Sequence, residues 1–225
     1  MPIFKQIQIR SLYQIVHSPT DMTNAHGDNM KAYRHHAEVE PTDQWQVCPH
    51  RFRHLFKTLP KNDLGRHCRK WPAGKADLKV ARIIQNHSQP HDLTLYTDGS
   101  VRRWKSGWGF CVKKGATTIH EDSAAFKGST SSLTMEKVAI SNALRWLASN
   151  RYSQTTRRAI ILTDSMNLIS KANQGRGSPD WFQAMQHIHL ESLMWMYCPA
   201  HAGVKGNEQA DWLARNAVIT DDRKW

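Results

Sequence analysis

Residues 93–100 read LTLYTDGS, and the interpretation of the chain starts from them. Their first five residues consist of leucine and β-branched or aromatic side chains, a composition typical of a strand. We expect this strand to end at Asp98, which is followed by Gly99 and Ser100. An Asp-Gly pair on its own most often belongs to a turn. Its meaning therefore depends on what the rest of the chain places beside Asp98.

The sequence after residue 100 predicts four more strands and four helices. The strands cover residues 107–112, 117–125, 159–163 and 193–198, and the helices cover 131–150, 166–174, 179–190 and 207–218. Thr134 is the expected N-cap of the first of these helices. The order β-β-β-α-β-α-α-β-α predicts an α/β fold with a mixed five-stranded sheet and helices packed on it.

The first ninety residues carry weaker signals, and we treat residues 1–90 as an N-terminal extension of a domain over 91–220. Residues 1–45 are polar and weakly patterned, and we expect poor structure there. Residues 76–84 predict a short helix, whose apolar side consists of Leu78, Ala81 and Ile84. Zinc-ligand residue types occur at Cys48, His50, His54, His67 and Cys68. Their spacing matches no standard zinc finger, and the sequence leaves open whether they bind metal.

The charge of the chain points to a polyanionic partner. It has 31 basic and 19 acidic residues and a formal net charge of +12. Nucleic acid is the commonest partner of such a surplus, although a merely solubilising charge is an equal alternative. No apolar run reaches the roughly 18 residues that would cross a membrane. With no secretory signal and no C-x-x-C pair, we expect an intracellular protein with reduced thiols, either nuclear or cytoplasmic.

Four acidic residues lie where they could form a common site. Asp98 and Asp164 follow predicted strands, while Glu136 and Asp211 lie in the first turns of predicted helices. Strand carboxyl ends open onto one edge of an α/β sheet. Singly, these residues could serve as a turn, a helix cap, a charge that complements a helix dipole or a plain surface group. Together their charges would repel one another, and a pair of Mg²⁺ ions that binds them could activate a water to attack a phosphodiester.

Four short motifs carry a resemblance to a known family. They are TDGS at residues 97–100, ME at 135–136, LTDS at 162–165 and PAHAGVKGNEQAD at 199–211. The last is the most specific, because it joins a loop histidine to a helix aspartate ten residues later. Over about residues 91–220 the chain resembles type 1 ribonuclease H. The sequences of these motifs look most similar to those of the ribonuclease H domains of animal non-LTR retrotransposon polyproteins.

The resemblance implies a ribonuclease H-like fold and a site for two Mg²⁺ ions, with Mn²⁺ as an alternative ion. The implied metal ligands are Asp98, Glu136, Asp164 and Asp211. His201 would assist proton transfer or product release, a role that suits the near-neutral pKa of histidine. The implied substrate contacts are Gly99, Ser100 and Ser132.

The chain departs from the family in how it would hold its substrate. Ser132 and Leu133 stand where cellular members carry Asn or Gln that contact the minor groove, and Leu133 cannot bond a 2′-hydroxyl. Residues 171–195 hold only two basic residues, so the basic protrusion of some members is missing. Further candidates for substrate contact are Trp104, Trp108 and Trp181, although core packing is favoured for Trp108.

These features favour an endonuclease, a hydrolase that cuts the RNA strand of RNA–DNA hybrids within a retroelement reverse-transcription machinery. Because no Tyr-x-Asp-Asp polymerase motif occurs, residues 50–90 would be the end of a polymerase connection, and a reverse transcriptase module would be a partner. The alternative is a catalytically weak or inactive nucleic-acid-binding remnant. A transposase or integrase of related fold is disfavoured by the TDGS and His201 motifs. The sequence does not decide the oligomeric state or any sequence preference.

Overall fold

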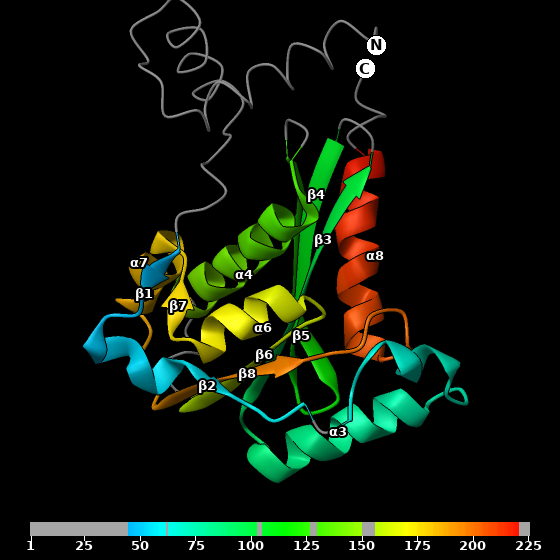
Figure 1. Cartoon of the computed structure of the whole chain (residues 1–225), viewed down its shortest axis with the longest axis horizontal. Coiled ribbons are helices and arrows are strands. Elements are labelled where there is room, and N and C mark those ends of the chain that lie inside the picture. Colours follow the sequence, from blue (N-terminus) through cyan, green and yellow to red (C-terminus); the bar gives the residue numbers. More distant parts are fainter. Residues whose placement is uncertain (1–44, 62, 103–104, 127–129, 150–155, 221–225) are drawn as a thin grey trace, which may run out of the picture. The chain divides into compact units, whose positions relative to one another are not determined.

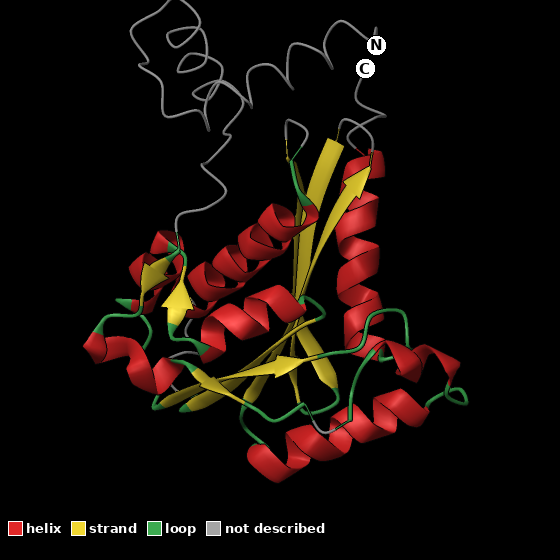
Figure 2. Ribbon diagram, viewed as in Figure 1, coloured by secondary structure: helices red, strands yellow, loops and turns green. Residues whose placement is uncertain are grey.

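The computed structural model describes residues 45–61, 63–102, 105–126, 130–149 and 156–220, all within one compact unit. Its centre is a mixed sheet with helices on both faces (Figure 1, Figure 2). The prediction of poor structure concerns residues 1–45, of which 1–44 lie outside the described residues. Among the helices that are described, none is long and apolar enough to cross a membrane.

The main sheet has six strands in the order β2-β8-β6-β3-β4-β5. Their bounds are Lys57–Thr58 (β2), Leu93–Arg102 (β3), Lys105–Lys114 (β4), Thr117–Phe126 (β5), Arg158–Thr163 (β6) and Ser192–Tyr197 (β8). The prediction of a mixed α/β sheet is confirmed, and all five predicted strands are present. The sixth strand, β2, comes from the N-terminal extension and pairs in parallel with β8.

Connection length explains the mixture of strand directions. Two residues separate β3 from β4, and two separate β4 from β5, and both pairs are antiparallel. Helical segments separate β5, β6 and β8, and the pairs β3–β6 and β6–β8 are parallel. Two-residue turns can join only antiparallel strands, whereas parallel neighbours need a longer crossover. Outside the main sheet, β1 (Gln46–Val47) pairs with β7 (Arg176–Gly177).

The described residues form five α-helices around the sheet. They are α3 (Lys75–His87), α4 (Ser132–Ser149), α6 (Met166–Asn173), α7 (Pro179–Met185) and α8 (Lys205–Thr220). In Figure 1, α4 and α6 lie on one side of β3 and β4, and α8 lies on the other.

The predicted helix over residues 179–190 is too long, because α7 stops at Met185. The predicted last helix starts too late, because α8 begins at Lys205.

Three glycines allow the helices to approach the sheet backbone to backbone. A Cβ on Gly99 would meet the backbone of α4, and a Cβ on Gly107 or Gly109 would lie within 2.7 Å of the backbone of Ala214 in α8. Gly99 pairs with Trp108, which lies between the other two glycines. Because side chains alternate between the faces of a sheet, α4 and α8 must cover opposite faces.

The apolar stripes predicted for α4 and α8 are confirmed as core. The α4 stripe is fully buried and consists of Ile140, Ala143, Leu144 and Leu147. The α8 stripe is also buried and consists of Ala210, Leu213, Ala214 and Ala217. The predicted N-cap of α4 is wrong, because the hydroxyl of Ser131 accepts a hydrogen bond of 3.0 Å from the backbone N–H of Thr134. Ser131 therefore caps the helix one turn before Thr134.

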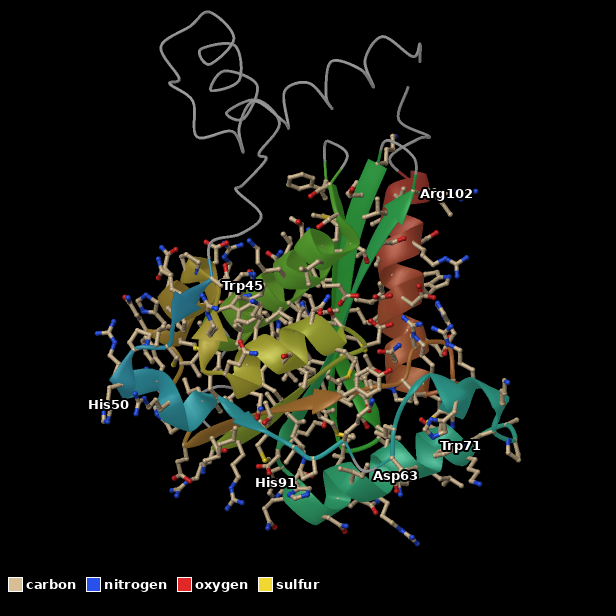
Figure 3. The ribbon with its side chains drawn as sticks, in the orientation of Figure 1. Trp45, His50, Asp63, Trp71, His91 and Arg102 are labelled. Atoms are coloured by element: carbon tan, nitrogen blue, oxygen red, sulfur yellow. The ribbon has the colours of Figure 1, made fainter. Side chains whose placement is uncertain are left out.

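The extension packs into the same core as the rest of the unit. Trp195 of β8 donates its ring N–H to the carbonyl of Leu55 at 2.7 Å and stacks on Phe56 with centroids 5.3 Å apart. Trp45, marked in Figure 3, meets Trp181 edge to face at 5.7 Å. Trp181 is fully buried, which removes it from the candidates for substrate contact.

One prediction for the extension is wrong, and one question that the sequence left open concerns possible metal ligands. The predicted apolar side of α3 is wrong, because Leu78 is 73% exposed while Ala76, Val80 and Ile83 are buried. The zinc-ligand residue types, whose metal binding the sequence left open, include one close pair, His67 Nε2 and Cys68 Sγ at 3.8 Å. In the described part of the chain, the two groups whose ligand atoms could share a metal ion contain none of those five residues.

Candidate active site

The register of two parallel strands brings Asp98 and Asp164 together. Pairing between β3 and β6 stops at Thr97 and Thr163, and each aspartate is the next residue along its own chain segment. Contrary to the prediction, β3 does not end at Asp98, because it continues to Arg102 while paired with β4. Asp98 and Gly99 therefore form no turn. The two carboxylates stand where the parallel part of the sheet stops.

Glu136 reaches the same place from α4 because Gly99 has no side chain. A Cβ on Gly99 would lie 2.4 Å from the backbone nitrogen of Glu136, far inside any normal contact. Glu136 is the fifth residue of α4, just beyond the predicted first turn. The hydroxyl of Thr163 donates a 3.1 Å hydrogen bond to its Oε2. One carboxylate oxygen each from Asp98, Glu136 and Asp164 lies within 4.8 Å of the others.

The electrostatics of these three carboxylates are unfavourable without cations. Burial raises the pKa of Asp98 well above its usual value, and the charges of Asp164 and Asp211 raise it further. Burial and the neighbouring Asp98 and Asp164 do the same to the pKa of Glu136. The pKa of Asp164 is also raised, mainly by burial, although the nearby His201 opposes the rise. Hard divalent cations would relieve this desolvated negative charge, and carboxylate oxygens are the ligands that Mg²⁺ prefers.

Asp211 comes from the second turn of α8, not the first as predicted. It belongs to a second group with His201 and Glu208, whose ligand atoms lie within 4.8 Å of one another. The two groups adjoin, since the charge of Asp211 raises the pKa of Asp98. The four predicted metal ligands are thus brought to one region of the molecule, three of them in direct mutual reach.

His201 lies on the loop between β8 and α8, at the rim of the site. Its Nδ1 is 3.9 Å from Oδ2 of Asp211, and its side chain is 58% exposed. Its backbone has a positive φ of 48°, a conformation that few residues other than glycine adopt. The ring of His201 is therefore open to solvent while it lies beside a carboxylate of the site.

Two further residues at the site were missed by the sequence analysis. Glu208 lies three residues before Asp211, a spacing that places both on one face of a helix, and its Oε1 accepts a 3.1 Å hydrogen bond from the N–H of Gly203. Arg215 lies one turn after Asp211, with Nη1 3.4 Å from Oδ2. The helical spacing around Asp211 was the signal that could have identified both.

The predicted substrate contacts lie next to the carboxylates. Gly99 and Ser100 follow Asp98 on β3 and are half-buried, and Ser132 is the exposed first residue of α4. Leu133 packs partly against the core. Trp108 stacks on Phe110 with centroids 6.1 Å apart, in agreement with core packing, while Trp104 lies outside the described residues.

A family comparison matches this arrangement. The family model described as RNase H matches residues 90–219, more than half of the chain, and the chain therefore belongs to the RNase H family. That family consists of nuclease hydrolases, and the mixed sheet and acidic site are found within the matched residues. A comparison with curated proteins gives no match.

Several solved structures are similar to the chain at low identity. LC11-RNase H1, solved in complex with an RNA/DNA hybrid, is 22% identical with a TM-score of 0.48, and the match covers 58% of this chain and 99% of that chain. The N-terminal RNase H domain of a Mycobacterium tuberculosis protein is 19% identical with a TM-score of 0.48, covering 59% and 96%. A foamy viral protease-reverse transcriptase in complex with an RNA/DNA hybrid is 18% identical with a TM-score of 0.48, covering 59% and 21%.

Proposed function

We propose that this chain is an endonuclease that hydrolyses the RNA strand of RNA–DNA hybrids with two divalent metal ions. The observation that carries the proposal is the meeting of Asp98, Glu136 and Asp164 within 4.8 Å, with Asp211 adjoining. Burial makes their negative charge unfavourable. The donor set is made of hard oxygens, which suits Mg²⁺, with Mn²⁺ as the alternative.

The acidic residues and His201 would have different roles in the reaction. Asp98, Glu136, Asp164 and Asp211 would hold two Mg²⁺ ions, which would supply an activated water and stabilise the leaving oxygen. The water oxygen forms a bond to phosphorus while the bond to the 3′ oxygen breaks, leaving a 3′-hydroxyl and a 5′-phosphate. His201, exposed at the rim, would deliver the proton that the 3′ oxygen takes up or would assist product release.

Recognition of the RNA strand would rest on the 2′-hydroxyl and on the shape of the groove. The exposed hydroxyl of Ser132 can donate to or accept from a 2′-hydroxyl. Gly99 and Ser100 would contact the same strand beside the carboxylates. The first two residues of α4 are Ser132 and Leu133, and Leu133 packs partly on the core. Of these two residues, only Ser132 would offer the substrate a polar side chain.

The proposal is tested by incubating the full chain with end-labelled RNA–DNA hybrid, with and without Mg²⁺. We expect Mg²⁺-dependent cleavage of the RNA strand and no cleavage of duplex DNA. Asp164→Asn should lose more activity than the 10–100-fold that loss of an outer-shell partner of a metal site typically causes. Asp122→Asn, the same change on an exposed residue of β5, is the matched control. Equal cutting by wild type and Asp164→Asn would reject the site, and hybrid binding without cleavage would favour the inactive remnant.

We also propose that the domain serves a retroelement reverse-transcription machinery, inside the cell. The sequences of the four motifs support the retroelement role. The four free cysteines suit a reducing compartment. A reverse transcriptase that lacks nuclease activity leaves its RNA template intact after copying it. Addition of this chain should then degrade the template, whereas a template that survives would count against the assignment.

A further inference from the structure

The loop that carries His201 is held by residues that precede the matched family segment. That segment begins at residue 90. Before it lie the short 3₁₀ helix η2 (Arg66–Lys70) and α3, both anchored in the core by buried residues such as Cys68 and Val80. Each of the two helices sends one polar side chain to the connection between β8 and α8.

Arg69 holds the beginning of that connection. Its Nε donates a 2.9 Å hydrogen bond to the carbonyl oxygen of Ala200, the residue immediately before His201. The guanidinium is planar and always charged, so the bond is a charge-assisted one with a defined direction. The same charge is close enough to Asp164 to oppose the rise in its pKa. Arg69 of η2 thus contacts the loop and carries its charge near the site.

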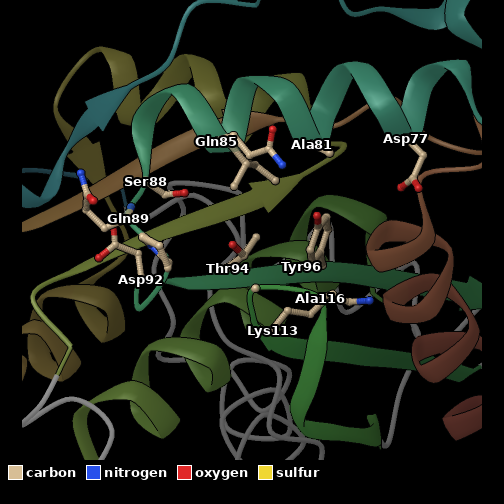
Figure 4. Close-up of a pocket in the computed structure, with 13 residues that line it drawn as sticks. Asp77, Ala81, Gln85, Ser88, Gln89, Asp92, Thr94, Tyr96, Lys113 and Ala116 are labelled. Carbon is tan, nitrogen blue, oxygen red and sulfur yellow. Dashed lines mark hydrogen bonds between the residues drawn. The ribbon is translucent and has the colours of Figure 1, made fainter.

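Asp77 holds the end of the connection. Its Oδ1 accepts a 3.1 Å hydrogen bond from the backbone N–H of Lys205, the first residue of α8. The first N–H groups of a helix have no partner within the helix, and a carboxylate there also complements the helix dipole. Figure 4 shows Asp77 on α3 at one end of a cavity of about 530 Å³ between α3 and the sheet, with its carboxylate directed toward α8.

The two contacts bracket a short and conformationally demanding segment. Between Ala200 and Lys205, both His201 and Gly203 have positive φ, at 48° and 76°. For His201 this conformation is unfavourable by itself and persists only when surrounding contacts hold it. Hydrogen bonds that hold this segment include the Arg69 and Asp77 bonds and the bond from Gly203 to Glu208. Val204 of the same segment is fully buried in the core, and His201 itself lies beside Asp211.

We propose that Arg69 and Asp77 are positioning residues that clamp the His201 loop, so that the extension completes the active site of the nuclease. The inference rests on the proposed function, because it assigns His201 a part in cleavage. If Arg69 and Asp77 act in this way, residues 90–219 alone would not be sufficient for full activity. The extension would act on turnover rather than on the affinity for the hybrid, since Arg69 and Asp77 bind the loop and not the substrate.

The test compares Arg69→Gln and Asp77→Ala with two controls in the full chain. Arg66→Gln removes the same charge from the same helix, and Arg66 donates no hydrogen bond to the described residues of the loop. Asp77→Asn keeps an acceptor oxygen and should behave like wild type. Amide hydrogen exchange of the peptide over residues 198–206 is measured without metal or nucleic acid. We expect exchange about 2- to 10-fold faster in Arg69→Gln and Asp77→Ala, the range for loss of one hydrogen bond.

Cleavage kinetics form the second arm. Arg69→Gln and Asp77→Ala should lower kcat for the hybrid while KM stays within about twofold, and Arg66→Gln should leave kcat unchanged. Unchanged loop exchange in both variants would overturn the clamp, and so would a rise in KM alone, which would make Arg69 a plain phosphate contact. If wild type cleaves no hybrid, the proposed function fails, while the exchange arm still decides whether the clamp exists.

Discussion

Replacing Gly99 with alanine should separate α4 from β3 and carry Glu136 out of the site. The added Cβ would lie 2.4 Å from the backbone nitrogen of Glu136 and 2.5 Å from the carbonyl carbon of Met135. Ordinary contacts of such atoms begin near 3.4 Å. Both neighbours are backbone atoms of a helix and cannot rotate away, so the helix must move by about 1 Å.

The size of the effect follows from that displacement. Overpacking of a well-packed core usually destabilises by about 1–3 kcal/mol. In a domain of this size, each kcal/mol lowers Tm by about 2–4 °C. A misplacement of about 1 Å in catalytic geometry can lower the rate about 100-fold. Gly99→Ala should therefore remain folded at room temperature and lose nearly all cleavage.

Three measurements check this reasoning: Tm by circular dichroism, Mg²⁺ affinity by titration calorimetry, and kcat/KM on labelled hybrid. Gly115→Ala is the control, because Gly115 has a positive φ of 60° with no atom within 4 Å of an added Cβ. It should lose about 1–2 kcal/mol through backbone strain while cleavage stays normal. Wild-type Mg²⁺ affinity and turnover in Gly99→Ala would show that the position of α4 does not depend on the absence of a side chain at residue 99.

Three other outcomes are expected. Asp164→Asn should raise the Tm of the metal-free protein at neutral pH, because it removes one charge from a cluster whose carboxyl pKa values are raised by burial; a lower Tm would contradict this. Raised folded-state pKa values favour folding fully only below about pH 4, the unfolded-state value, and that contribution is lost as the pH rises. The Tm of metal-free wild type should therefore fall relative to that of Asp164→Asn as the pH rises above about 4, and added Mg²⁺ should abolish the difference. Leu55→Ala, which empties a fully buried position of the extension, should destabilise the described unit by about 2–5 kcal/mol in one cooperative transition; two separate transitions would show that the extension folds independently.

The parts of the structure that the sequence predicted are those with local signals. The periodicity of α4 and α8 marks their buried faces, and alternation marks β3 through β5. The positions of Asp98, Asp164 and Glu136 relative to strands and helices were sufficient to predict their convergence. For Asp98 and Asp164 the rule that strand carboxyl ends open onto one edge of the sheet was enough. For Glu136 the prediction also needed a helix that packs back over that edge.

The failures involve contacts between distant segments. The α3 sequence offers two apolar stripes at helical spacing, and the partner surface alone selects the one with Val80 and Ile83 over the one with Leu78. The β2 strand has two residues, too few for a pattern. The Arg69 bond spans 131 residues and the Asp77 bond spans 128. An exposed arginine and a first-turn aspartate give no sequence signal for partners so far away.

The pairing of β2 with β8 also affects self-association of the protein. The opposite edge of the sheet, β5, presents the exposed acidic residues Glu121 and Asp122, which discourage addition of another strand. Residues 193–197 of β8 are buried apolar or aromatic residues and lack such protection. A fragment that starts at residue 91 would leave this edge uncovered, with free N–H and C=O groups ready to pair with a neighbour. Its self-association should increase with concentration, while the full chain stays dispersed.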